Sequence, residues 1–151
     1  MGPVIAIDLE TRDPRIKDLG PGWKREGDGE VVGIAIADEH QKIYLPFAHR
    51  SGDNLAKELV LRYTKRCIEG ATEVIMANAQ YDLGWLRIVG IRVPCVVRDI
   101  QVAEALIDEE RNSYSLNNLA FDYTGERKDE RHLREVSQAY SDANKGFCPK
   151  G

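Results

Sequence analysis

Two acidic residues, Asp8 and Glu10, end a short apolar stretch near the start of the chain. Side chains alternate along a β-strand, so residues two apart share a face, with their α-carbons roughly 6.5–7 Å apart. Two carboxylates this close repel each other unless a cation lies between them, and oxygen ligands of this kind suit Mg²⁺ or Mn²⁺. The pattern therefore indicates either a divalent-metal site or a strand end that runs into solvent, where such triplets are common by chance.

A second polar group, Asn78 to Asp82, directly follows another apolar stretch. If a helix starts near Ala79, Asn78 can cap it, and Asp82 lies about one turn further along the same side. Ligands of open α/β sheets bind outside the carboxyl ends of the strands, so Asp82 could meet the first pair of acids there. On the simpler alternative, Asn78 is only a helix cap and Asp82 is a surface acid.

The hydrophobic pattern predicts the elements that must position these residues. A hairpin comes first, and strands then alternate with helices, which implies an α/β mixed sheet with helices on its faces. The segment 11–30 is rich in Gly, Pro and charge and is expected to be a long loop. Asp53 or Asn54 is the expected cap of the first long helix. The predicted strands are 4–10, 31–38, 42–49, 73–77 and 93–97, and the predicted helices are 54–70, 79–90, 100–107, 115–123 and 126–141.

Composition limits the classes of protein. The length of 151 residues suits one ordinary domain, and 42% hydrophobic with 30% charged residues is typical of a globular chain. A net charge of −4 argues against binding nucleic acid through a general basic surface. It leaves room for an enzyme that holds a strand end locally, because bound cations neutralise a carboxylate cluster.

Cysteine usage and hydropathy exclude further classes. Cys67, Cys95 and Cys148 are odd in number and widely spaced, which argues against a zinc site and a disulfide scaffold and fits reduced thiols in the cytoplasm. No apolar run approaches the roughly 20 residues that span a bilayer, so no membrane association is expected.

Taken together, the two motifs form an ordered set: D-x-E-T at 8–11, then strand, strand, helix and strand, then N-x-x-x-D at 78–82. In this order, residues 4–124 resemble the DnaQ-like (DEDD) 3'-5' exonucleases, and especially the proofreading domain of family A DNA polymerases, including phage ones. The segment 99–120 strengthens the likeness through a strand-end Asp, an apolar helix and the phrase YSL-x-x-LA, here Tyr114 to Ala120. The resemblance implies a single domain over 1–151 with a ribonuclease-H-like mixed five-stranded sheet and helices on both faces, in agreement with the five predicted strands.

The resemblance also implies a metal-dependent reaction. Asp8, Glu10 and Asp82 match three of the family's four metal-binding carboxylates, which would bind two divalent cations, Mg²⁺ or Mn²⁺. One cation would activate a water molecule and the other would stabilise the departing 3' oxygen, in an in-line attack that releases a nucleoside monophosphate. An acidic protein can then hydrolyse an anionic polymer, because the ions carry the electrostatic load.

The implied substrate is the 3' end of single-stranded DNA. Thr11 matches the position beside the terminal nucleotide, and Asn78 and Tyr81 match positions that help to hold the strand. The implied partner is a polymerase domain in the same longer chain, in the cytoplasm of a bacterial or phage-infected cell. The cations that follow D-x-E-T are the best-placed phosphate contacts, although loop charges are often only solvated: Arg12, Arg15, Lys17, Lys24 and Arg25.

The chain departs from the family at the third motif. The family's fourth carboxylate comes from a late helix with Y-x-x-x-D or H-x-x-x-D, whose spacing places both residues on one helical face. Here Tyr140 is followed at that spacing by Asn144, and His132 by Val136, while Asp142 lies only two residues beyond Tyr140. We therefore expect this chain to be C-terminally incomplete, truncated before the third motif, and weakly active or inactive by itself.

The absence of the fourth carboxylate also fits a divergent domain. Asn144 can replace the ligand in a weak or inactive domain, or Asp99 or Asp142 can substitute for it, although Asp99 is better placed to cap the helix that begins at Ile100. The alternative function is accordingly a catalytically inactive ribonuclease-H-like domain that binds nucleic acid or supports a neighbouring domain.

The histidines and aromatic residues are expected to play structural roles. Trp23 either packs against the core or stacks on a base from its long loop. His40 and His49 are expected to be surface or packing residues. Tyr44, Phe47 and Trp85 are expected to pack in the core or to cover a sheet face.

Overall fold

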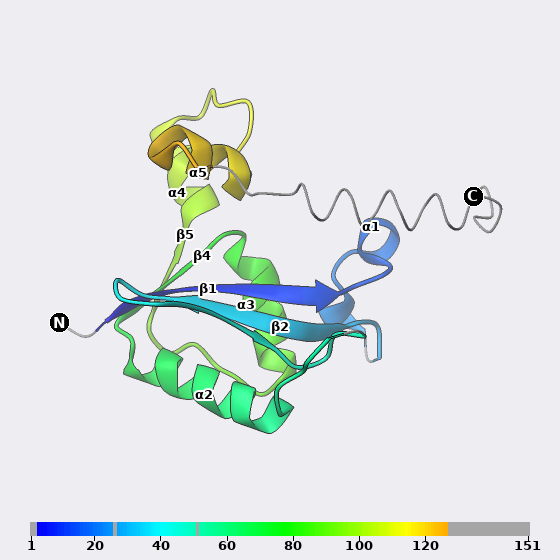
Figure 1. Cartoon of the computed structure of the whole chain (residues 1–151). Helices are drawn as coiled ribbons and strands as arrows, with labels where there is room; N and C mark the ends of the chain where they lie inside the picture. Colours follow the sequence, from blue (N-terminus) through cyan, green and yellow to red (C-terminus); the bar gives the residue numbers. More distant parts are fainter. Residues whose placement is uncertain (1–2, 26, 51, 127–151) are drawn as a thin grey trace. The chain divides into compact units, whose positions relative to one another are not determined.

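The computed structural model describes residues 3–25, 27–50 and 52–126 (Figure 1). It divides into two compact units, Met1–Arg111 and Asn112–Gly151. The elements of the first unit are β1 (Val4–Arg12), α1 (Ile16–Leu19), the 3-10 helix η1 (Gly22–Lys24), β2 (Glu30–Ala37), β3 (Lys42–Pro46), α2 (Lys57–Gly70), β4 (Glu73–Met76), α3 (Ala79–Ile88), β5 (Val96–Asp99) and α4 (Ile100–Ile107). The predicted helix 126–141 and the third-motif candidates His132, Tyr140, Asp142 and Asn144 lie outside the described residues, apart from the first residue of that helix.

The second unit contributes one described helix, α5 (Leu116–Thr124), where a helix over 115–123 is predicted. Ser115 caps it by accepting a hydrogen bond from the backbone amide of Asn118, and Gly125 ends it with a φ of 74°. None of the described helices has the length and apolar character that crossing a bilayer demands. Cys67 and Cys95, the two cysteines among the described residues, are free thiols.

The five strands form one mixed sheet in the order β3-β2-β1-β4-β5. β2 pairs antiparallel with β1 and β3, and β4 pairs parallel with β1 and β5. This arrangement confirms the predicted hairpin and the predicted mixed five-stranded sheet. Because β1 and β4 are parallel neighbours, their carboxyl ends meet at the same edge of the sheet, where the candidate site is expected.

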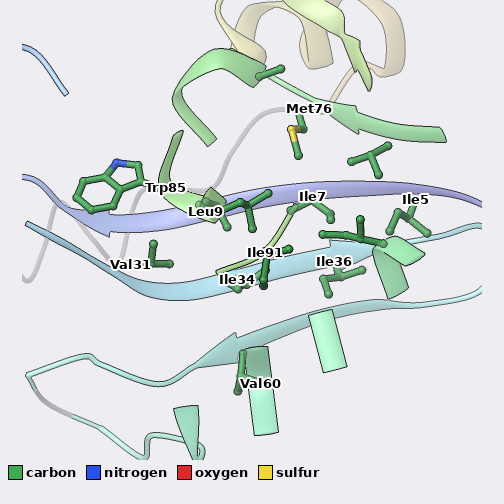
Figure 2. Close-up of a cluster of buried hydrophobic side chains, with 14 of the residues drawn as sticks. Ile5, Ile7, Leu9, Val31, Ile34, Ile36, Val60, Met76, Trp85 and Ile91 are labelled. Atoms are coloured by element: carbon green, nitrogen blue, oxygen red, sulfur yellow. The ribbon is translucent and has the colours of Figure 1, made fainter. Parts of the chain in front are cut away.

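One face of the sheet carries the hydrophobic core (Figure 2). Helices α2 and α3 pack onto this face, and each buried large apolar side chain contributes about 1.5–3 kcal/mol to folding. The odd-numbered residues Ile5, Ile7 and Leu9 of β1 are buried on this face. Because strand side chains alternate, Asp8 and Glu10 lie on the opposite face. The core includes Ile5, Ile7, Leu9, Ile34, Ile36, Val60, Ile68, Val74, Met76, Trp85 and Leu86.

Helix α2 begins at Lys57, and neither of its predicted caps, Asp53 or Asn54, makes a capping hydrogen bond. The Asn54 side chain instead binds both backbone groups of His49: its Oδ1 accepts from the amide, and its Nδ2 donates to the carbonyl, each at 2.9 Å. The prediction that Asp53 or Asn54 caps this helix is therefore wrong. The Asn54 side chain pairs with loop backbone instead, an alternative that short amide side chains have to capping a helix.

The segment between β1 and β2 is more ordered than the predicted long loop, since it contains α1 and η1. Asp28 in this segment is buried, at 5% exposure. Its carboxylate accepts hydrogen bonds from Nε of Arg15 at 2.9 Å and from Nε of Arg25 at 2.6 Å. The two guanidinium groups lower the pKa of the Asp28 carboxyl below its ordinary value, with the larger effect from Arg15. A single buried acid thus ties the two ends of the segment together.

Trp23 connects this segment to α3. It packs against the core, as the first of its two interpretations predicts, and a Cβ added to Gly84 would lie 2.4 Å from Cε2 of its indole ring. The close approach of the indole to the helix backbone thus requires glycine at position 84.

We expect Gly84→Ala to lower the free energy of unfolding by about 1–3 kcal/mol, because the added methyl displaces the Trp23 ring from a packed position. Urea unfolding followed by tryptophan fluorescence measures the change. Gly70→Ala is the matched control, since a Cβ there meets no atom within 4 Å and the site is also helical. Equal stability of the two variants would contradict the packing role of Gly84.

Candidate active site

Asp8 and Glu10 share one face of β1, as the alternation predicts, and this face is exposed. In the register with β2, Asp8 is opposite Ala35 and Glu10 is opposite Gly33, so small neighbours flank both acids on that side. The ladder shifts register directly after Glu10, where Thr11 pairs with Val31. The extra residue of this bulge is Val32 on β2, and a bulge bends the strand that carries it, here directly beside the end of the strand that bears the acids.

Asp82 lies in the first turn of α3 and is 3% exposed. Its pKa is raised to about 7, mainly because burial disfavours the charged form, and further because Asp8, Asp99 and Glu10 place negative charge nearby. Its Oδ2 atom is buried and has no hydrogen-bond partner in the described part of the chain. The fold therefore brings a buried, unsatisfied carboxyl group within electrostatic reach of the two acids on β1.

A divalent cation fits this arrangement. The described residues include no group of three His, Cys, Asp or Glu side chains already gathered as a complete metal site. Like charges without a counter-ion repel each other, so carboxylates are expected to close around a cation only when it binds. The buried Oδ2 of Asp82 is an oxygen ligand that lacks a partner among the described residues, and oxygen is the ligand that Mg²⁺ and Mn²⁺ prefer.

Asp99, one of the candidates to substitute for the fourth metal ligand, has a structural role. Its carboxylate caps α4, as predicted, by accepting from the amides of Gln101 and Val102, and it also accepts from the backbone amides of Asn78 at 3.2 Å and Ala79 at 2.7 Å. One carboxylate thus satisfies the amino ends of two helices. With four backbone donors around it, Asp99 is poorly suited to replace the fourth metal ligand.

Asn78 does not cap α3 with its side chain, so that prediction is wrong. Its backbone adopts the left-handed conformation, with φ 60° and ψ 55°, which asparagine tolerates better than most residues. Because Asp99 takes over the capping, the side-chain amide of Asn78 makes no hydrogen bond within the described residues and remains at the carboxyl end of β4.

Thr11 and Tyr81 meet directly: Oγ1 of Thr11 and the hydroxyl of Tyr81 are hydrogen-bonded at 2.8 Å. The Tyr81 hydroxyl also donates to Oδ2 of Asp13 at 3.1 Å, and the same oxygen accepts from the amide of Gly22 at 2.8 Å. Burial raises the pKa of Tyr81, which keeps the phenol neutral and able to donate. Asp13 was not predicted from the sequence, where its only signal is its position two residues after Thr11.

Three of the five cations that follow D-x-E-T form ion pairs. Arg12 is paired with Glu30, and Arg15 and Arg25 are paired with Asp28. Lys24 lies 5.3 Å from the centroid of the Trp23 ring. Three of the predicted phosphate contacts thus hold the β1–β2 connection together.

The strand order and the mixed pairing define the fold class, a ribonuclease-H-like sheet. Solved nucleases share the fold. One described as the apo form of the nuclease has a TM-score of 0.59 at 14% identity, covering 86% of this chain and 56% of that one. NrnC of Brucella melitensis bound to pGG has a TM-score of 0.58 at 14% identity, covering 87% of this chain and 57% of that one.

Sequence comparison identifies the family more specifically than the structural comparison does. A family profile described as "3'-5' exonuclease" matches residues 1–143. The chain belongs to this family, the 3'-5' exonuclease domains of family A DNA polymerases. It is 39% identical over 150 residues to a DNA-directed DNA polymerase of Pseudomonas phage M6, covering 97% of this chain and 22% of the polymerase. The resemblance stated from the motifs is therefore confirmed.

We expect the stability of the cation-free protein to fall as pH rises from about 4 to about 7. The Asp82 carboxyl ionises near its ordinary pKa of 3.8 in the unfolded chain but at about 7 in the folded one, so the folded state binds more protons in this window. The loss is roughly 1–4 kcal/mol, and Asp82→Asn should abolish it. Urea unfolding in EDTA between pH 4 and pH 8 measures it.

Asp53→Asn, at an exposed acid, is the control for this experiment and should keep the wild-type pH profile. Addition of Mg²⁺ or Mn²⁺ at pH 8 should raise the unfolding midpoint of the wild type more than that of Asp82→Asn. If Asp82→Asn shows the same pH dependence as the wild type, the buried carboxyl is not the source of the effect.

Proposed function

We propose that this chain is a two-metal-ion exonuclease that hydrolyses phosphodiester bonds at DNA 3' ends and serves as the proofreading domain of a DNA polymerase. The observation that carries the proposal is the buried carboxyl of Asp82, with a pKa raised to about 7 beside Asp8 and Glu10. Family membership supports the direction of hydrolysis, and the phage relative supports DNA as the polymer.

Asp8, Glu10 and Asp82 are the residues that would hold the cations. Two divalent ions, Mg²⁺ or Mn²⁺, supply a nucleophilic water and stabilise the departing 3' oxygen when bound. Asp82 contributes a fixed ligand on a helix that is packed into the core, whereas Asp8 and Glu10 contribute exposed side chains on a central strand. Ionisation of Asp82, which burial opposes, then becomes favourable because a cation neutralises the charge.

Thr11, Asn78 and Tyr81 would hold the 3'-terminal part of the strand. The side-chain amide of Asn78, unengaged within the described residues, offers both a donor and an acceptor at the carboxyl end of β4. Thr11 and Tyr81 are fixed to each other and to Asp13, so their hydroxyl groups are held in place before a substrate arrives. Such prior ordering lowers the entropic cost of positioning a nucleotide.

The source of the fourth ligand distinguishes the two candidate functions. Tyr140 and Asn144 lie outside the described residues, and a Y-x-x-x-D motif beyond Gly151 in the reading frame would supply the fourth acid. Asn144 at the spacing where the family has a carboxylate favours the alternative of an inactive ribonuclease-H-like domain that binds nucleic acid or supports a neighbour.

We expect Asp8→Ala and Asp82→Ala each to reduce release of nucleoside monophosphates from single-stranded DNA by about a hundredfold or more, because each removes a charge that holds a cation. The assay uses 5'-labelled DNA with Mn²⁺, and both the 151-residue chain and the complete product of its reading frame. The control is Glu69→Ala on α2, which should keep full activity.

Shortening from the 5' end, or activity that survives both substitutions, would contradict the proposed reaction. Lack of activity in both wild-type proteins, with intact binding of single-stranded DNA, would support the inactive-domain alternative.

A further inference from the structure

Tyr44 is exposed on the same sheet face as the candidate metal ligands. The register places it opposite Ala35 on β2, and Ala35 is in turn opposite Asp8 on β1. Its side chain is 45% exposed and belongs to neither the buried core nor the apolar groups packed against it. The hydrophobic effect therefore gives only a partial reason for an aromatic residue at this position.

The phenol ring lies across β2 towards Glu10. A Cβ built on Gly33 would lie 2.2 Å from the Tyr44 hydroxyl, so the hydroxyl occupies the space above Gly33 that any other residue would fill. Gly33 is the cross-strand partner of Glu10. In agreement with this placement, the pKa of Tyr44 is raised, first by burial and then by the negative charge of Glu10.

The Tyr44 hydroxyl also contacts His49. Nε2 of His49 is hydrogen-bonded to it, and the two rings meet edge to face with centroids 5.9 Å apart. His49 is in turn fixed by the two hydrogen bonds between its backbone and the Asn54 side chain. When Nε2 carries the proton, the Tyr44 oxygen accepts from His49, and its own O–H is available to donate outward.

We propose that Tyr44 binds the 3'-terminal nucleotide by donating a hydrogen bond from its hydroxyl to an oxygen of the sugar–phosphate backbone, and that His49 is the positioning residue that orients this hydroxyl. A neutral donor suits the place, because it holds an anionic strand beside Glu10 without forming an ion pair that would withdraw the carboxylate from a cation. The inference rests on the proposed nuclease function and adds a substrate contact on the β3 side of the site, separate from Thr11 and Tyr81.

The test is steady-state hydrolysis of single-stranded DNA with Mn²⁺ by the complete product of the reading frame. Tyr44→Phe should raise KM about three- to tenfold and leave kcat within about twofold, as loss of one neutral hydrogen bond to the substrate predicts. His49→Ala should raise KM similarly, and His49→Gln should restore part of the loss, since an amide can still donate to the phenol. In a Tyr44→Phe background, His49→Ala should have no further effect on KM.

Gly33→Ala keeps the phenol but displaces it and should also raise KM, which gives an independent variant if Tyr44→Phe folds poorly. Tyr63→Phe is the matched control, because that tyrosine is 40% exposed on α2, which packs on the opposite face of the sheet. An unchanged KM for Tyr44→Phe and Gly33→Ala in an active enzyme overturns the inference and leaves the nuclease proposal standing. An inactive wild type overturns both.

Discussion

The proposed site depends on repulsion between negatively charged side chains whose positions are fixed by the fold. Asp82 is buried on a helix packed into the core, and Asp8 and Glu10 are fixed in direction because Ile7 and Leu9 beside them are buried. Two like charges about 4 Å apart cost about 4 kcal/mol at an effective dielectric constant near 20. Burial in the first place, and then the neighbouring negative charges, favour the protonated form of Asp82 and raise its pKa to about 7. A divalent cation would neutralise the same negative charges.

The backbone amides at the start of α3 are satisfied in a way that leaves the Asn78 side chain unengaged within the described residues. Asp99 serves the amino ends of both α3 and α4, so Asn78 can adopt a left-handed backbone without having to cap its own helix. The same carboxylate also adds negative charge near Asp82 and contributes to its raised pKa. Asp99 therefore acts twice, as a structural cap and as part of the field that makes a cation favourable.

How much was predictable from sequence depended on how local the cause was. The shared face of Asp8 and Glu10 follows from the two-residue period of a strand, and the Asp99 cap of α4 involves adjacent residues, so the sequence alone predicts both. Which face of β1 is exposed depends on the helices that pack against the sheet. The Asp99 cap of α3 requires that β5 lie beside β4, a tertiary fact that no local pattern contains. Likewise, the place of Tyr44 over Gly33 depends on the register between β2 and β3.

The β1–β2 connection shows why the acidic balance of the chain is compatible with an anionic substrate. The sequence offers five cations after D-x-E-T, but Arg15 and Arg25 pair with Asp28 and Arg12 pairs with Glu30, so three of the five form ion pairs within the chain. Long-range attraction is weak in a chain of net charge −4. Affinity in the proposed reaction must therefore arise locally, from bound cations and from short-range donors such as the side-chain amide of Asn78, and it should depend on divalent ion concentration more strongly than on monovalent salt.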